Sequence, residues 1–129
     1  MSEKDELDEI FVDRNEPASK KVLVRILKPF VIIDEEGVIN FLDAYDGLKE
    51  IHKALVYMIC KKAMVLRGIE SIKEPAGPKE ISEGAMISEV NAKHALYRDH
   101  KFLVKKEEGG HIIPNYKLSK VEEVLKNGS

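Results

Sequence analysis

The sequence predicts an α+β fold, and three stretches carry this prediction. Residues 21–41 are apolar and β-branched around an acidic turn, as in paired strands. Residues 42–68 place apolar side chains at the spacing of a long helix. Residues 77–119 read as a short helix, a tight turn, a second helix and two short strands. A chain of 129 residues is about one domain long, so we expect one domain over residues 20–129.

The amino-terminal part is predicted to hold an acidic arm and then strands. Residues 1–19 are acidic with little periodicity, which favours a flexible arm. Two apolar runs separated by Pro29 follow, and residues 34–37, with the sequence Asp-Glu-Glu-Gly, are typical of a turn. The apolar character resumes at residues 38–41, which indicates a hairpin within strands over residues 20–41. Residues from Val38 onward also fit the start of the next helix.

Residues 42–68 are predicted to form one long, dimerising helix. Their apolar positions follow the i, i+3, i+4, i+7 series, and residues 54–60 are apolar almost all round. Such a helix must be buried on more than one side, so we expect a homodimer formed through residues 42–68. Cys60 lies in the middle of this helix, and its apolar neighbours favour an inert core thiol over a nucleophile.

Local signals define the elements of the carboxy-terminal half. Pro78 suits the first position of a helix over residues 78–84, and Ser88 suits the N-cap of a second helix. We expect His100 or Lys101 to end the second helix, and His tolerates a left-handed cap better than most residues. Two strands, residues 102–106 and 112–118, would flank a Gly-Gly tip, and a closing helix would cover residues 120–127.

The second helix, residues 89–101, has two contrasting faces. At about 100° per residue, Ala92, Ala95 and Leu96 point to one side, where small side chains allow close packing. The opposite side has no acidic residue and carries Asn91, Lys93, His94, Tyr97, Arg98 and Lys101. Asn and Arg pair bidentately with adenine and guanine edges, and Lys and Tyr commonly hold phosphates. The alternative is an ordinary solvated face of an amphipathic helix.

The order of elements in residues 77–119 resembles the winged helix-turn-helix superfamily. Phe102-Leu103-Val104 is similar to the apolar triplet that opens the first wing strand, although the junction before it lacks the customary Gly. The resemblance implies that helix 89–101 enters the DNA major groove and that residues 102–118 form a wing on the backbone. Phosphate contacts would then come from Lys105, Lys106, His111 and Lys117. The implied function is sequence-specific binding of double-stranded DNA by a transcriptional regulator.

Charge and composition qualify this interpretation. The net charge of −2 argues mildly against DNA binding, because the phosphate backbone rewards basic proteins. The acidic excess lies in residues 1–70, with 11 Lys/Arg against 14 Asp/Glu, while residues 71–129 have 10 against 9. The chain lacks Gln, Thr and Trp and is rich in Lys and Glu, a pattern typical of archaeal-type hyperthermophiles.

Cysteine usage and hydropathy indicate a cytoplasmic protein. The single cysteine cannot form an internal disulfide, which favours an intracellular setting. No apolar run approaches the ~20 residues that a membrane helix needs, and residues 1–9 are acidic rather than basic like a signal peptide. We therefore expect no membrane association.

No pattern in the sequence predicts catalysis, a metal or a cofactor. His94 and His100 are six residues apart, a spacing that puts them on different helical faces, and no paired-carboxylate, nucleophile–base or dinucleotide pattern is present. We therefore do not expect an enzyme. Two other functions fit the same elements: a winged-helix subunit that binds other proteins without DNA, and a regulator that senses a small molecule in a pocket near the amino-terminal strands. For the second, no residue in the sequence specifies a ligand.

Overall fold

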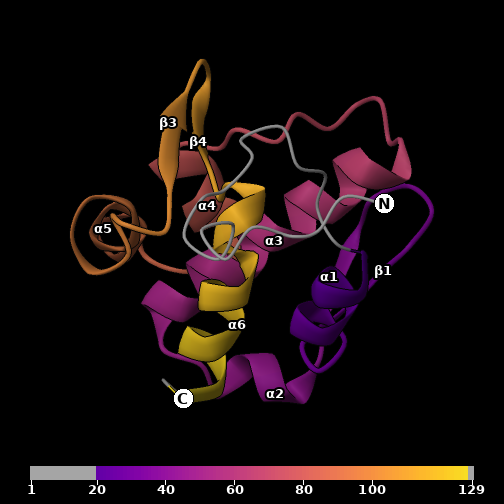
Figure 1. The fold of residues 1–129 in the computed structure, drawn as a ribbon, viewed down its shortest axis with the longest axis horizontal. Helices are drawn as coiled ribbons and strands as arrows, with labels where there is room; N and C mark the ends of the chain where they lie inside the picture. The colour runs from indigo at the N-terminus through magenta and orange to yellow at the C-terminus, as the bar shows by residue number, and fades with distance from the viewer. Residues whose placement is uncertain (1–19, 128–129) are drawn as a thin grey trace, which may run out of the picture.

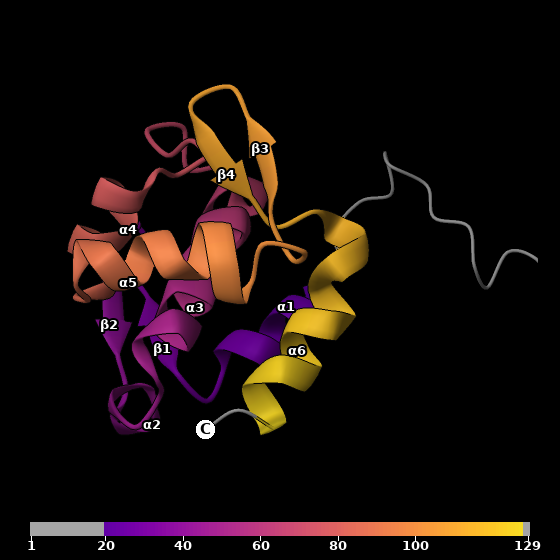
Figure 2. The same ribbon diagram turned by 90° about the vertical axis from the view of Figure 1, so that its left-hand side faces the viewer.

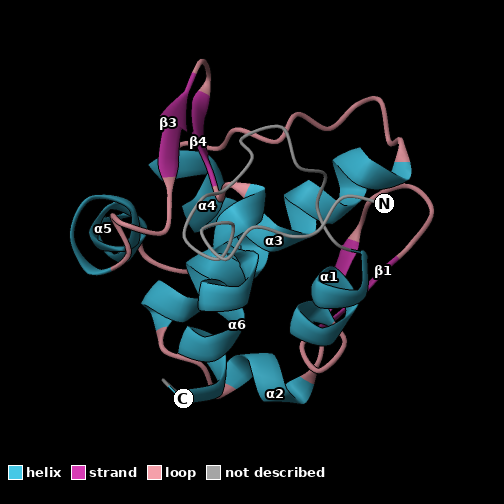
Figure 3. Ribbon diagram, in the orientation of Figure 1, coloured by secondary structure: helices cyan, strands magenta, loops and turns pink. Residues whose placement is uncertain are grey.

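The computed structural model describes residues 20–127, so the predicted arm over residues 1–19 lies outside the described part. Over this range six α-helices and two separate two-stranded antiparallel sheets form an α+β fold (Figures 1 and 3). The elements are α1 (Lys20–Leu27), β1 (Val31–Ile33), β2 (Ile39–Phe41), α2 (Asp43–Asp46), α3 (Glu50–Arg67), α4 (Pro78–Ala85), α5 (Glu89–His94), β3 (Lys105–Glu107), β4 (Gly110–Ile112) and α6 (Leu118–Asn127).

Helix α3 runs through the centre of the fold. Helices α1, α4 and α5 all pack against it, and α6 packs against α1 (Figure 2). Its middle turns are fully enclosed, with Ala54, Leu55, Val56, Ile59 and Cys60 inaccessible to solvent. Burial raises the pKa of the Cys60 thiol to about 12. The apolar surface of this helix is therefore covered by the chain's own elements, and its burial does not require a second subunit.

The prediction of a strand over residues 21–27 is wrong, because these residues form helix α1. Leu23, Ile26 and Leu27 are buried at helical spacing, while Val24 is 58% exposed. A helix buries all three apolar side chains on one face, whereas an alternating strand would divide them between two faces. The Arg25 guanidinium donates to the Glu122 carboxylate at 2.9 and 3.2 Å, which adds a polar contact between α1 and α6.

The predicted hairpin within residues 20–41 is present as β1 and β2. The register pairs Val31 with Phe41 and Ile33 with Ile39. The Asp34 carboxylate accepts the backbone N–H groups of Glu36 at 2.9 Å and Val38 at 3.0 Å, which closes the turn. Asp34 therefore has a local structural role in the turn, and Val38 does not start the next helix.

The predicted long helix over residues 42–68 is divided in two. Helix α2 ends at Asp46 and α3 begins at Glu50, so three residues interrupt the helical backbone. Tyr45, in α2, and Leu48, within the break, are 1% and 6% exposed, so both lie in the core.

The β3–β4 hairpin is shorter than predicted, because its two strands pair only near the turn that joins them. The predicted strands cover residues 102–106 and 112–118, but the pairing extends only from Lys105 with Ile112 to Glu107 with Gly110. Leu103 turns inward and is 7% exposed, which removes residues 102–104 from the strand. Pro114 lacks a backbone N–H and ends the second strand, and the chain enters a 3₁₀ turn at Asn115–Lys117 before α6.

The hairpin is joined to the core through the backbone of Ala76. The Ala76 N–H donates to the carbonyl of His111 at 3.0 Å, and the His111 N–H donates back at 2.9 Å. A Cβ at Gly110 would lie 2.5 Å from the Ala76 carbonyl carbon, and Gly110 has φ of 148°. Both the close approach and the backbone angle therefore require glycine at position 110.

We expect Gly110→Ala to lower the free energy of unfolding by at least about 2 kcal/mol, because the new methyl group must displace the Ala76 backbone. Chemical denaturation measures this change. Gly47→Ala is the matched control, since Gly47 has a negative φ of −80° and a Cβ at this position would meet nothing closer than 3.7 Å. The control should change stability by less than about 1 kcal/mol. Equal losses in the two variants would contradict this account of the hairpin.

Two buried histidines lie close together in the core. His52 is near the start of α3, and His100 directly follows residues Ala95–Asp99, which continue from α5. The rings of His52 and His100 lie 5.1 Å apart and are 5% and 7% exposed. Burial lowers the pKa of His100, the neighbouring His52 lowers it further, and Asp99 acts in the opposite direction. The native protein therefore favours neutral His100, and this contribution to stability is lost as pH falls below the ordinary histidine pKa of 6.5.

The variant His100→Gln should accordingly show a shallower fall in stability than the wild type between about pH 6.5 and pH 5. Denaturant titrations at several pH values measure the slope for both proteins. A variant whose stability falls as steeply as that of the wild type would show that His100 does not contribute to the acid sensitivity.

Candidate nucleic-acid interface

The turn between α4 and α5 is fixed by its own side chains. Pro78 occupies the first turn of α4, as predicted, and Met86 ends the helix with φ of 60°. The Ser82 hydroxyl donates to the Ile87 carbonyl at 2.6 Å, and the Ile87 N–H donates to the Ser82 carbonyl at 3.0 Å. These two hydrogen bonds close the turn, so the angle between the helices is set locally.

Three residues from α2 and α3 hold this turn against the body of the protein. The buried Tyr45 hydroxyl donates to the Ala85 carbonyl, and the Glu50 carboxylate accepts the Ser88 N–H at 2.8 Å. The Tyr57 ring lies so close to Gly84 that no space is left for a Cβ at that position. The helix-turn-helix unit is thus attached to the central helix at several points.

Ser88 caps the amino terminus of α5, as predicted. Its hydroxyl accepts the backbone N–H of Asn91 at 3.1 Å. The Glu50 carboxylate also lies at this helix end, where the Ser88 N–H and then the Asn91 side chain lower its pKa. Asn91 is therefore half-buried and directed at Glu50 rather than presented freely to solvent.

The second half of the predicted helix over residues 89–101 is π-helical. Residues Ala95–Asp99 follow α5 in a wider turn, and His100 ends the segment with φ of −123°. The predicted left-handed cap at His100 is therefore wrong. Ala92, Ala95 and Leu96 are buried as predicted. A π-turn advances each residue by less than the ~100° of an α-helix, so the calculated helical faces do not apply beyond Ala95.

Six of the ten predicted contact residues are exposed, three are half-buried and one is buried. The exposed residues are Lys93, Tyr97, Arg98, Lys101, Lys105 and Lys106, and the half-buried residues are Asn91, His94 and Lys117. Figure 2 shows α5 lying across one face of the molecule with the β3–β4 hairpin projecting beyond it. The six exposed residues therefore lie on α5, on the residues that follow it and on the β3–β4 hairpin.

His111 does not lie on this exposed surface. Its side chain is 7% exposed, and the edge of its ring meets the Tyr97 ring at a centroid distance of 5.3 Å. Burial lowers its pKa, and the nearby Lys106 lowers it further. A neutral, enclosed imidazole cannot reach a phosphate, so His111 is better described as the residue on which Tyr97 rests.

Acidic neighbours reduce the positive field of the exposed cations. The Arg98 guanidinium pairs with Asp99 at 3.1 Å, and Lys105 pairs with Glu107 at 3.6 Å. The Lys101 ammonium lies 5.0 Å from the centre of the Phe102 ring. Since both ion pairs are exposed, a competing phosphate can displace either carboxylate at little cost.

The same surface has an apolar component that the sequence did not predict. Val90 is 61% exposed and Phe102 is 77% exposed, and Met86 on the turn is 66% exposed. Phe102 is predicted to open the first wing strand, but β3 begins only at Lys105, so Phe102 lies outside the hairpin. Val90 is visible in the sequence as an apolar residue on the cationic face of the helix.

Residues 20–127 contain neither a candidate metal site nor a helix that could span a membrane. Within this range no group of three or more His, Cys, Asp or Glu side chains is arranged to hold a metal ion. No helix in the described part of the chain has the length and apolar character required to cross a bilayer.

Comparison of the chain with protein-family models, curated proteins and solved structures found no match. A function for this protein is therefore inferred from the residues and contacts described above.

We expect Ser88→Ala to lower the free energy of unfolding by about 1 kcal/mol, because α5 loses the acceptor for one of its first N–H groups. Thermal or chemical unfolding measures the loss. Ser119→Ala, at an exposed position of α6, should change stability by less than about 0.5 kcal/mol. A Ser88→Ala variant as stable as this control would show that the cap does not stabilise the helix.

Proposed function

We propose that this protein binds double-stranded DNA as a sequence-specific transcriptional regulator. In this proposal α5 and the π-helical segment after it enter the major groove, and the β3–β4 hairpin lies along the flanking backbone. The observation that carries the proposal is the common exposure of Lys93, Lys101, Lys105 and Lys106 on a helix and hairpin that are both fixed to the core.

The order of elements supports a winged-helix interpretation. A central helix, α3, is followed by the bridge at Ala76, then α4, the turn, α5 and the β3–β4 hairpin. This order is compatible with the superfamily that the sequence resembles, in which a helix-turn-helix is followed by a two-stranded wing. The α1 helix and the β1–β2 hairpin are additions on the amino-terminal side.

A second function, binding to another protein, is favoured by a specific observation. Val90, Tyr97 and Phe102 are all more than half exposed on the surface that carries the cations. Aromatic side chains such as Tyr97 and Phe102 are enriched at protein interfaces, and Tyr is also enriched among the residues that contribute most of the binding energy. Under this alternative the lysines would form the polar rim of a protein contact.

Binding of duplex DNA by the paired variant Lys93→Ala/Lys101→Ala tests the proposal. Electrophoretic retardation of random duplex DNA at about 50 mM salt should require clearly more of the variant than of the wild type. The dependence of affinity on salt should also be shallower, by about 0.9 per phosphate contact removed. Sequence-specific binding is tested separately by selecting bound oligonucleotides from a random pool.

The matched control is Lys20→Ala/Lys28→Ala, which removes two exposed lysines in and just after α1. Figure 1 shows α1 on the side of the molecule away from α5. The control should bind DNA as the wild type does. Absence of retardation at micromolar wild-type protein, or an equal loss in both double variants, would exclude DNA binding through α5 and leave the protein-binding function.

The predicted homodimer through residues 42–68 remains a proposal within this function. Val65 and Leu66, near the end of α3, are 39% and 43% exposed and are the apolar part of that helix open to a second copy. A two-fold dimer would present two recognition helices to half-sites about 34 Å apart. The mass in solution, measured by light scattering, distinguishes the dimer from the monomer.

A further inference from the structure

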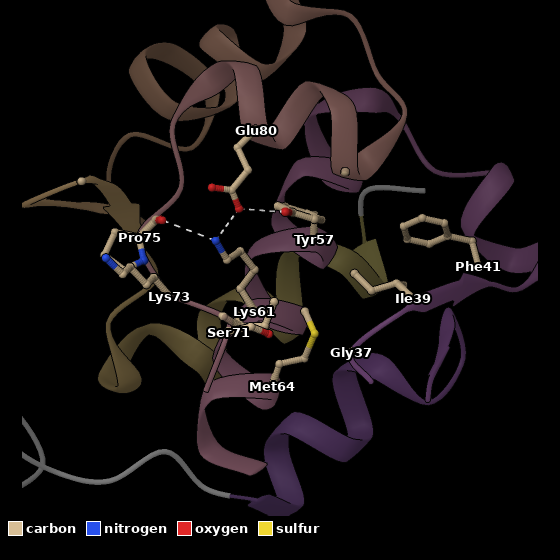
Figure 4. Close-up of a pocket in the computed structure, with 13 residues that line it drawn as sticks. Gly37, Ile39, Phe41, Tyr57, Lys61, Met64, Ser71, Lys73, Pro75 and Glu80 are labelled. Atoms are coloured by element: carbon tan, nitrogen blue, oxygen red, sulfur yellow. Dashed lines mark hydrogen bonds and ion pairs between the residues drawn. The ribbon is translucent and has the colours of Figure 1, made fainter. Parts of the chain in front are cut away.

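A groove of about 620 Å³ lies beside the helix-turn-helix unit, on the side of α3 that faces α4 and the β1–β2 hairpin. We call it the Lys61 groove. Its size falls within the ~300–1,000 Å³ typical of small-molecule sites. Residues from α3, α4 and the β1–β2 hairpin line it, together with the 71–75 loop and the tip of the β3–β4 hairpin. Figure 4 shows part of this lining.

The polar end of the groove is built around an almost fully buried ammonium group. The Lys61 side chain is 6% exposed and pairs with the Glu80 carboxylate, which is 43% exposed. The same carboxylate oxygen accepts the Tyr57 hydroxyl at 2.8 Å, and the Pro75 carbonyl lies 3.5 Å from the Lys61 ammonium. An ammonium has three N–H donors, and these contacts use two of them.

The opposite side of the groove is apolar. Ile39 and Phe41 from β2 and Met64 from α3 line it, and Figure 4 shows them across from the Lys61 ammonium. Ile72 contributes a further aliphatic side chain from the 71–75 loop. The groove is therefore amphipathic, with its charged groups at one end and its aliphatic and aromatic groups at the other.

The charges that line the groove favour an anion. Lys61 and Lys73 supply two positive charges against the single negative charge of Glu80. The Glu80 carboxylate is already shared by Lys61 and Tyr57, so it offers little to a cationic ligand. A neutral ligand cannot offer a charge to the spare donor of the buried Lys61 ammonium, and the exposed Lys73 adds positive charge to the same groove.

We propose that the Lys61 groove binds a small amphipathic carboxylate. The carboxylate lies against the ammonium groups of Lys61 and Lys73, and the aliphatic or aromatic body lies on Phe41 and Met64. This ligand site goes beyond the proposed DNA binding and does not depend on it. It also gives specific residues to a small-molecule function for which the sequence alone indicated none.

Methionine methyl signals in NMR test the proposal without DNA. Hexanoate, hexanol and hexylammonium share one aliphatic chain and differ in their head group. Hexanoate should shift the Met64 methyl signal in a saturable way, because Met64 lines the groove, and should leave that of Met86, which lies on the exposed α4–α5 turn. Hexanol and hexylammonium should bind at least about tenfold more weakly, a difference that one charge-assisted contact can produce.

Three lysine variants locate the carboxylate. Lys61→Met and Lys73→Met should each weaken hexanoate binding severalfold. Lys62→Met is the matched control, because Lys62 is equally buried on α3 but pairs with Glu74 at 2.7 Å and does not line the groove. It should bind hexanoate as the wild type does. Lys73 is exposed, so its variant remains informative if a buried lysine variant does not fold.

Several outcomes would overturn the proposal. These are the absence of a saturable Met64 shift up to about 10 mM hexanoate, equal binding of hexanol or hexylammonium, and unchanged binding in both Lys61→Met and Lys73→Met. Because no DNA is present, a negative result here leaves the DNA-binding proposal untouched, and the absence of DNA retardation leaves this one untouched.

Discussion

Two neighbouring buried lysines on α3 hold residues 74–80 in place against the central helix. Both Lys61 and Lys62 have side chains only 6% exposed, and a buried ammonium is costly unless an anionic or carbonyl oxygen compensates it. Lys61 finds Glu80, and Lys62 finds Glu74. These two carboxylates lie on either side of Ala76 in the chain, so satisfying the two charges also positions the backbone to which the β3–β4 hairpin is joined.

The sequence predicted the elements whose boundaries are decided locally. Pro78 and Ser88 act through groups one to three residues away, and both mark helix starts as expected. Helix α1 was missed because its β-branched composition favours a strand, whereas burial against α3 and α6 decides its structure. Leu103 illustrates the same limit, since its inward turn, which shortens the hairpin, depends on a core assembled from distant segments.

The candidate interface was partly predictable for the same reason. Exposure of Lys93 follows from the amphipathic pattern of α5, but the π-helical turn that redirects the later side chains, up to Lys101, has no comparable signal in the sequence. Glu50 lies 38 residues before Ser88 in the chain, so its contact with the start of α5 required the folded structure. The resulting surface combines cations with exposed apolar groups, and this combination is what makes nucleic acid and protein the two competing partners.

The close approach of Tyr57 to Gly84 has a consequence for how such a chain can evolve. With no room for even a methyl group at position 84, a larger residue there requires a smaller one at position 57. Losing the phenol would also remove the hydroxyl that Glu80 accepts. Related chains should therefore vary at positions 57 and 84 together, while the acid at position 80 should be kept wherever position 61 remains a buried lysine.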